Sequence, residues 1–273
     1  MRRDDSLHER SARSALLKSH VVISLKSAEE IDRMREAGRL VAEAHTAVRA
    51  MIQPGLSTQE IDEEIRDFVT ARGGSLLFYK YRGFPANSCI SINSEVVHGI
   101  PRKRRKLSEG DIVSVDIGVR LKGYCGDSAW TFPVGEISEE AQQLLEVGEA
   151  ALTRGIEACV AAGHVSDIGR AIQTYVEDQG YTVVKQFVGH GIGVKLHEDP
   201  QVPNYVDDGF LKRDPELKPG MVLAIEPMVN SGDEEVETLD DGWTVVTKDR
   251  QLSVHFEHTV AVLEGGPRVL TVS

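Results

Sequence analysis

Residues 107–116 have the sequence LSEGDIVSVD, and residues 217–226 have the sequence LKPGMVLAIE. Both stretches begin Leu-X-X-Gly, continue through a mostly apolar segment and end in a carboxylate. The same tripeptide, His-Gly-Ile, precedes each of them, at 98–100 and at 190–192. A duplicated unit of this kind can bring acids and histidines from both halves to one site. Such a site is rich in the oxygen and nitrogen ligands that bind divalent metal ions.

The order of predicted elements repeats as well. Apolar residues at helical spacing, with capping and stop signals, predict two helices in each half, at 27–53, 57–72, 138–162 and 167–179. In each half, extended segments follow the pair of helices. A strand that carries one of the acids, Asp116 or Glu226, comes next. We therefore expect an α+β fold in which two similar halves form one continuous sheet with helices on its outer face.

Composition limits the class of protein. The chain has 273 residues and a formal charge of −12, so it has no excess of Lys and Arg to bind nucleic acid specifically. Its three cysteines are far apart and odd in number, which is typical of reduced thiols in a cytoplasmic protein. No apolar run approaches the ~20 residues of a membrane span, so no membrane partner is expected. Residues 1–20 are predicted to be a mixed-charge tail.

The first acid-bearing strand, 111–119, is predicted to form a hairpin with 124–132 through a turn at 121–123. Pairing Asp116 with Asp127 places the centre of this hairpin between residues 121 and 122. The two carboxylates would then face each other, which is unfavourable unless a cation lies between them. The alternative is that both acids face solvent, which is the usual place for Asp.

The second acid-bearing strand supports the first interpretation. Glu226 and Glu257 both lie in apolar alternating segments, and the midpoint between them falls between Asp241 and Gly242, a typical hairpin turn pair. The segments are interrupted by polar residues, so their register stays open. Four carboxylates on two apolar hairpins, together with His190, match the ligands of a dinuclear metal site.

At this point the sequence resembles type I methionine aminopeptidase, a peptidase family with the pita-bread fold. The resemblance extends from about residue 21 to the C-terminus and depends on the motifs in their order: CISIN (89–93), VHGIP (97–101), VDIG (115–118), GDS (126–128), GHGIG (189–193), HEDP (197–200), IEPM (225–228), DGWT (241–244) and FEHT (256–259). It implies an internally duplicated, curved and mostly antiparallel sheet. It also implies a single catalytic domain, 21–273, with halves at about 21–135 and 136–273.

The resemblance implies a metal-dependent hydrolase that removes the N-terminal methionine from nascent proteins with a small second residue. A hydroxide bridging two divalent ions would attack the first peptide bond. In the family, the residues at Asp127 and Glu257 bridge both ions. Asp116 chelates one ion, and His190 with Glu226 completes the other. Glu226 would also accept the proton, and the sequence does not choose among Mn, Fe, Co and Zn.

The resemblance assigns substrate contacts to His98 and His197, which are also counted with Glu226 as catalytic residues. Met specificity needs an apolar pocket for a flexible thioether. The positions that match the family's pocket are Tyr81, Phe84, Cys89, His98 and Trp243, with Leu196 nearby. Taken without the resemblance, a lone His beside Gly or an apolar residue such as Phe84 is more often structural.

Other histidines and charges are left without a catalytic role. Strand alternation turns His258 away from Glu257 and keeps His255 on its side, so His255 stays unassigned. The remaining histidines are predicted to be surface or loop residues: His8, His20, His45 and His164. The basic run 102–106 could contact ribosomal RNA near the nascent chain, although its composition favours a solvated turn. The tail lacks the zinc-finger extension seen in part of the family.

Three other classes of protein share parts of this pattern. A proline-directed peptidase of the same fold usually carries a substantial extra N-terminal domain, which about 20 tail residues cannot supply. A metal-free binding protein of this fold would be expected to lack ligands, whereas all five matching positions are filled here. The type II enzyme has a helical insertion for which the 35 residues between His190 and Glu226 leave no room. We therefore expect a cytoplasmic metallo-aminopeptidase, monomeric, with at most a transient ribosome contact.

Overall fold

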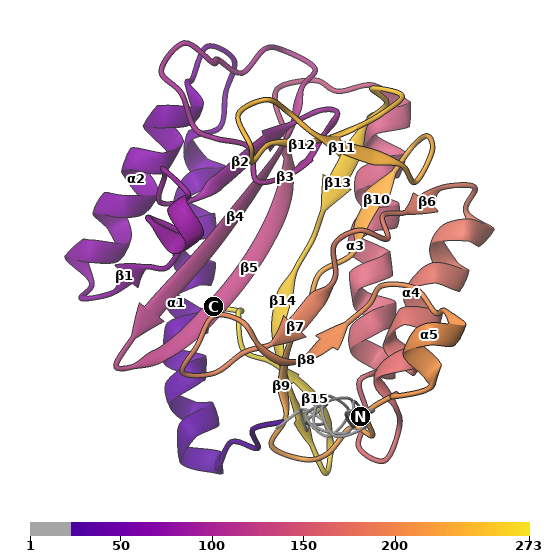
Figure 1. Ribbon diagram of the computed structural model, residues 1–273. Coiled ribbons are helices and arrows are strands. Elements are labelled where there is room, and N and C mark those ends of the chain that lie inside the picture. Colours follow the sequence, from indigo (N-terminus) through magenta and orange to yellow (C-terminus); the bar gives the residue numbers. More distant parts are fainter. Residues whose placement is uncertain (1–22) are drawn as a thin grey trace, which may run out of the picture.

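The computed structural model describes residues 23–273, so the predicted tail, His8 and His20 lie outside the described residues. Two pairs of long helices stand on either side of the sheets (Figure 1). The first pair is α1 (Ala28–Met51) and α2 (Thr58–Ala71), and the second is α3 (Glu139–Ala158) and α4 (Val165–Asp178). A short helix, α5 (Asp208–Leu211), follows. Within the described part of the chain, no helix is both long and apolar enough to cross a membrane.

Capping boxes begin the two helices of the first half, as the sequence predicts. The Ser27 hydroxyl accepts a hydrogen bond from the Glu30 backbone N–H, and the Glu30 carboxylate accepts one from the Ser27 N–H. Ser57 and Glu60 repeat this arrangement at α2. These reciprocal bonds satisfy backbone donors that have no partner within the helix.

The predicted bounds of the second pair of helices need correction. Helix α3 begins after the predicted cap Ser138 but ends at Ala158, four residues early. Val160, inside the predicted range, therefore lies beyond the helix and is 43% exposed. Helix α4 begins at Val165, two residues before the predicted start, because the Asp167 carboxylate accepts the backbone N–H of His164 and caps the earlier turn.

The described strands all pair antiparallel, and they form four sheets rather than one unbroken sheet. Their bounds in the first half are β1 (Ser75–Leu76), β2 (Cys89–Ile92), β3 (Glu95–Val97), β4 (Ile112–Leu121) and β5 (Tyr124–Pro133). Those in the second half are β6 (Thr182–Val183), β7 (Gly189–Gly191), β8 (Glu198–Val202), β9 (Val222–Ile225), β10 (Met228–Asn230), β11 (Val236–Thr238), β12 (Val245–Thr247), β13 (Ser253–His255), β14 (His258–Leu263) and β15 (Gly266–Val269).

The first hairpin has a different register from the predicted one. Leu121 pairs with Tyr124, so the turn consists of Lys122 and Gly123, with φ angles of 50° and 91°. A two-residue turn with positive φ at both positions matches the twist of the strands. Asp116 consequently faces Ala129 instead of Asp127. Because the shift is two residues, Asp116 and Asp127 remain on one face as diagonal neighbours.

The second pair of strands keeps the register expected from Glu226 and Glu257. Ile225 pairs with His258, and Met228 pairs with His255, so the two glutamates are opposite each other at the gap between these ladders. Strands β11 and β12 continue the same register towards a turn at residues 239–242. The predicted midpoint between Asp241 and Gly242 is therefore confirmed.

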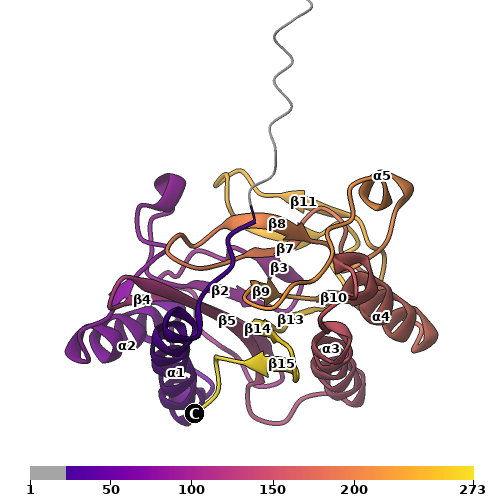
Figure 2. The same ribbon diagram turned by 90° about the horizontal axis from the view of Figure 1, so that it is seen from below.

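The two halves meet where β5 lies beside β14 (Figure 2). Side chains and backbone exchange hydrogen bonds across this seam. The Ser128 hydroxyl donates to the Glu257 carbonyl at 2.7 Å, the Thr259 hydroxyl donates to the Asp127 carbonyl at 2.8 Å, and the Glu257 N–H donates to the Ala129 carbonyl at 2.9 Å. These hydrogen bonds therefore hold the backbones around Asp127 and Glu257, the two predicted bridging acids, directly against each other.

One histidine prediction is wrong. His45 is not a surface residue: it is 6% exposed, and its Nε2 lies 2.9 Å from the Ser128 carbonyl oxygen. Helix α1 packs against β5, and this contact covers the imidazole. His164 is exposed at the start of α4, as predicted.

Candidate active site

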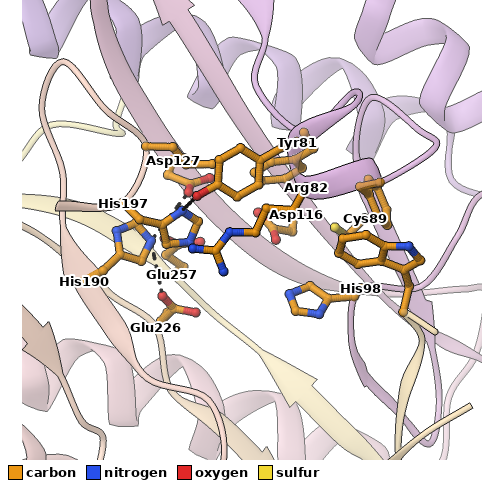
Figure 3. A pocket seen from close by; sticks show the side chains of 14 residues that line it. Tyr81, Arg82, Cys89, His98, Asp116, Asp127, His190, His197, Glu226 and Glu257 are labelled. Carbon is orange, nitrogen blue, oxygen red and sulfur yellow. Dashed lines mark hydrogen bonds and ion pairs between the residues drawn. The ribbon is translucent and has the colours of Figure 1, made fainter.

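One pocket of about 160 Å³ collects the residues that the sequence singles out. Its lining comprises the five predicted metal ligands (Asp116, Asp127, His190, Glu226 and Glu257), the two predicted substrate histidines (His98 and His197), and Tyr81, Phe84, Cys89, Leu196 and Trp243 (Figure 3). Phe78 and Arg82 also line it and were not predicted. Residues from both halves, separated by more than a hundred positions, therefore share one cavity.

A compact cluster lies at the buried end of this pocket. Ligand atoms of Asp127, His190 and Glu257 all lie within 4.8 Å of one another. His190 Nε2 is 3.9 Å from Asp127 Oδ2 and 3.6 Å from Glu226 Oε1. Strand β5 supplies the first acid and β7 supplies the imidazole. Both glutamates come from the gap in the ladders of the second half, where Pro227 interrupts the strand.

The backbones of the other two acids, Asp116 and Glu226, are held by neighbouring residues. Asp116 lies in the middle of β4, opposite Cys89 of β2. The Asn204 side-chain amide donates to the backbone carbonyl of Glu226 at 3.0 Å, which holds that residue just beyond β9. Figure 3 shows both carboxylates in the pocket, Asp116 from β4 and Glu226 from the segment just after β9.

Burial of four acids together is electrostatically unfavourable. Desolvation raises the pKa of Asp116, Glu226 and Glu257 well above their usual values, with a further contribution from the neighbouring carboxylates, and raises that of Asp127 to about 7. Three carboxylate oxygens, Asp116 Oδ1, Asp127 Oδ1 and Glu257 Oε1, are buried without a hydrogen-bond partner. Unpaired buried oxygens of this kind fit divalent cations, which would offset the repulsion.

His190 is held as a neutral imidazole. Its Nδ1 lies 2.9 Å from the Gly191 carbonyl oxygen, which can only accept, so Nδ1 carries the proton. The lone pair of Nε2 then faces Asp127 and Glu226. Burial lowers the pKa of His190 to about 3, so the imidazole stays neutral near pH 7. In many metal sites, a hydrogen bond of this kind from the second ring nitrogen to a backbone carbonyl fixes the orientation of the histidine.

The two predicted substrate histidines lie on different walls. The His197 ring stacks on Tyr81, with 5.3 Å between ring centroids, and its Nδ1 lies 2.9 Å from the Tyr81 hydroxyl. His98 makes edge contacts with Phe187 and Trp243. Burial lowers the pKa of His98 to about 4 and also lowers the pKa of His197, to which the Arg82 charge contributes.

An apolar wall adjoins the acids. Phe84 and Cys89 are buried, and the Phe84 ring meets Trp243 edge-on at 5.2 Å between ring centroids. Phe78 adds to this wall, and Arg82 lies at its exposed rim. Both lie within three residues of Tyr81 in the chain, which is the one sequence signal that could have found them, although neither belongs to a family motif. The pocket therefore joins a polar, acid-rich end to an apolar side.

The histidines that flank Glu257 behave as alternation predicts. His255 Nε2 is 3.6 Å from Glu226 Oε2 and has no hydrogen-bond partner. His258 points away, with its Nδ1 2.7 Å from the Thr271 hydroxyl. His255 thus lies behind Glu226 and does not line the pocket.

The fold and this cluster of buried acids and imidazole are those of a metal-dependent hydrolase. The model of metallopeptidase family M24 matches residues 32–264. Methionine aminopeptidase 1 of Bacillus subtilis is 50% identical over 92% of this chain and 99% of its own length. The methionine aminopeptidase of Clostridium perfringens is 49% identical over the same shares of both chains.

A solved structure agrees with these sequence matches. The crystal structure of methionine aminopeptidase from Thermotoga maritima has a TM-score of 0.89 and 40% identity, covering 92% of this chain and all of that one. The chain therefore belongs to metallopeptidase family M24, within its methionine aminopeptidases. The predicted pita-bread class is confirmed, and membership of a metallopeptidase family implies that the chain binds divalent metal.

Proposed function

We propose that this chain removes the N-terminal methionine from nascent polypeptides and peptides whose second residue is small. One observation carries the proposal: four carboxylates and His190 converge at the end of a pocket whose other wall is apolar and aromatic. The acids suit hydrolysis of a peptide bond. The apolar wall suits an unbranched thioether side chain.

We assign the metal site to Asp116, Asp127, His190, Glu226 and Glu257, holding two divalent ions. The unpaired oxygens of Asp127 and Glu257, one from each half, support a bridging role for these two residues. When bound, the ions would supply Lewis acidity for the scissile carbonyl and lower the pKa of a water molecule. Oxygen ligands with a single imidazole accept Mn, Fe, Co or Zn, so the residues do not select among them.

The chain's own residues would position the substrate and move the proton. Glu226, held at its backbone by Asn204, accepts the proton of the attacking water and passes it to the leaving amine. When the Tyr81 hydroxyl donates to His197 Nδ1, Nε2 of that ring carries a proton and can donate to the substrate carbonyl. His98, on the opposite wall, contacts the scissile amide. Cys89, Phe84 and Trp243 hold the methionine side chain.

The setting we propose is the cytoplasm, with the chain acting as a monomer on newly made N-termini. A ribosome contact through the basic run 102–106 is less favoured, because two of its charges are already used. Arg105 forms an ion pair with Glu95, and Arg102 lies 3.4 Å from Asp241. A transient contact through the remaining residues of the run stays a hypothesis.

Release of free methionine from Met-Ala and Met-Pro peptides tests the activity, with Leu-Ala and Gly-Pro peptides as controls. We expect turnover of the two Met peptides only. Turnover should be lost with chelator and restored by added Mn, Fe, Co or Zn. Preferential cleavage of the Gly-Pro peptide would favour a proline-directed peptidase instead. Unchanged activity after complete metal removal, verified by elemental analysis, would exclude the hydrolytic metal site.

A further inference from the structure

The one positively charged side chain among the pocket-lining residues, Arg82, has no role in the proposed chemistry. Its guanidinium lies over the Tyr81 ring, 5.5 Å from the ring centroid, and its charge contributes to the lowered pKa of His197. Figure 3 shows the side chain pointing into the pocket. Within residues 23–273 it forms no salt bridge, whereas Arg102 and Arg105 nearby in the chain both do. A cation is therefore presented to whatever enters the pocket.

The loop that carries Arg82 has a defined conformation. Lys80 and Arg82 adopt left-handed backbone conformations, with φ of 65° and 49°, which are uncommon for residues other than glycine. Two backbone bonds brace the turn: Lys80 N–H donates to the Phe84 carbonyl at 2.8 Å, and Phe84 N–H donates to the Tyr81 carbonyl at 2.9 Å. This turn directs Tyr81 and Arg82 into the same pocket, so the guanidinium does not depend on a freely moving loop.

The direction of the bound peptide places Arg82 on the leaving-group side. Asp127, Glu257, Phe84 and Cys89 are buried, so the methionine and its scissile bond occupy the inner part of the pocket. The rest of the peptide has to leave across the exposed rim, where Arg82 lies. A planar guanidinium donates two parallel hydrogen bonds to a carboxylate, and this geometry makes it a selective partner for that group.

We propose that Arg82 binds a carboxylate of the substrate on the leaving-group side of the scissile bond and makes the enzyme prefer substrates that carry one. This inference rests on the proposed function. The carboxylate has two sources: an Asp or Glu side chain near the third residue of a peptide, or the terminal carboxylate of a dipeptide. Either source would present two carboxylate oxygens to Arg82 at the exposed rim of the pocket.

The test measures kcat/KM for matched peptides at low ionic strength. Met-Ala-Asp-Ser-Leu amide is compared with its Asn and Lys counterparts, and Met-Ala with free carboxylate is compared with Met-Ala amide. We expect the wild type to prefer the peptide with the carboxylate about threefold to tenfold, as for an exposed charge-assisted pair. The preference should shrink in 1 M salt, because exposed charges are then screened.

Variants assign the effect to one side chain. Arg82→Gln should bring the ratios to about one, and Arg82→Glu should reverse them in favour of the Lys peptide. Lys80→Gln is the matched control: it removes the same charge from the same loop, at an exposed residue that does not line the pocket, and should keep the wild-type ratios. Loss of the ratio with only one type of substrate identifies which source of carboxylate Arg82 binds.

Several results would overturn the inference. Ratios near one in the wild type would overturn it, and so would wild-type ratios that persist in Arg82→Gln. An equal fall in kcat/KM for all peptides in Arg82→Gln would also overturn it, because it would indicate contact with the peptide backbone instead. Failure of the proposed function looks different, because no Met peptide would be cleaved by any of these proteins. That outcome would refute the inference together with the activity.

Discussion

In the first half, β4 and β5 pair over ten consecutive residues around a two-residue turn, whereas the corresponding strands of the second half pair in three short ladders that share one register. Asp116 and Asp127 belong to the regular ladder. Glu226 and Glu257 lie where pairing is interrupted. The comparison shows that the repeat preserves the position of the acids without preserving the strands that carry them.

The two kinds of support suggest two kinds of role. A short Asp side chain on a continuous ladder has little freedom and suits a fixed ligand. A longer Glu side chain at a break has more reach, although hydrogen bonds hold the backbone of both glutamates. The contrast between a short and a longer acidic side chain leads to measurable differences between the halves.

The largest expected effect distinguishes the acids of the two halves. Glu226→Gln should lower kcat by about 10²–10⁴-fold, because the proton acceptor is lost. Asp116→Asn should act mainly by weakening metal binding, so added metal should restore part of its activity. Steady-state kinetics over a metal titration separates the two. Equal rescue of both variants by metal would remove the distinction in role between Glu226 and Asp116.

The same Glu226→Gln protein provides a stability control. In chelator, the variant has one fewer buried carboxylate to desolvate, so its melting temperature should equal or exceed that of the wild type. Thermal unfolding with and without chelator measures this. A clear loss of stability in chelator would mean that Glu226 is needed for folding, and its loss of activity would then say nothing about proton transfer.

A buried ion pair joins the first half to the irregular second half. Lys26, ahead of α1, lies 2.7 Å from Glu198, and the two side chains are only 4% and 15% exposed. Glu198 also accepts the Lys195 N–H, which ties down the loop that carries His197. Lys26→Met should cost about 3 kcal/mol of unfolding free energy, because it leaves Glu198 buried without its partner.

A matched substitution is available on the surface. Lys248 and Glu235 form a pair of similar length, 2.8 Å, with side chains that are 50% and 67% exposed. Lys248→Met should cost much less than Lys26→Met, because solvent screens exposed pairs. Denaturant unfolding compares the two variants. Equal losses of unfolding free energy in the two variants would show that burial of the Lys26–Glu198 pair adds nothing to its effect on stability.

His45 tests the seam through pH. Burial lowers its pKa from 6.5 to about 4 in the folded protein, so between pH 4 and 6.5 the unfolded chain binds more protons at this residue. Its contribution to stability is therefore complete above pH 6.5 and is lost as the pH falls towards 4. Compared with the wild type, His45→Gln should have a slope of unfolding free energy against pH that is about 1 kcal/mol per pH unit shallower in that window. Identical slopes would contradict the buried neutral imidazole.

The smallest effect concerns the turn of the regular hairpin. Lys122 has φ of 50°, next to Gly123, and Asn-Gly is a preferred pair for such a turn. Lys122→Asn should therefore raise the unfolding free energy by about 0.5–1 kcal/mol, with activity unchanged. Its exposed ion pair with Glu36 should offset little of the gain. Destabilisation would show that the turn depends on that pair.

Sequence predicted what depends on local chemistry. Ser27 and Ser57 begin helices because their capping partners lie three residues further on, and the second-half register followed from a turn pair at its midpoint. The resemblance extends over almost the whole chain, so it could identify site residues from distant segments. These residues line one pocket in the structure. Their roles as ligands and catalysts, and the division near residue 135, stay predictions.

The misses come from tertiary contacts and turn geometry. The hairpin centre was placed one residue early because the turn could not be distinguished from its neighbours by residue type: Lys122 is not a typical residue for positive φ. His45 looked exposed because its partner, the Ser128 carbonyl, is 83 residues away. Arg82 has no motif of its own, and only the fold brings it to the pocket rim.

His98 carries a cost of a different kind. Its φ is 59°, a left-handed conformation that costs a side-chain-bearing residue roughly 1 kcal/mol, and Gly or Asn would adopt it more easily. Selection for thermostability alone should therefore drift away from histidine at this position, whereas selection for turnover should hold it. Libraries randomised at residue 98 would separate the two pressures, with the most heat-resistant survivors among the least active.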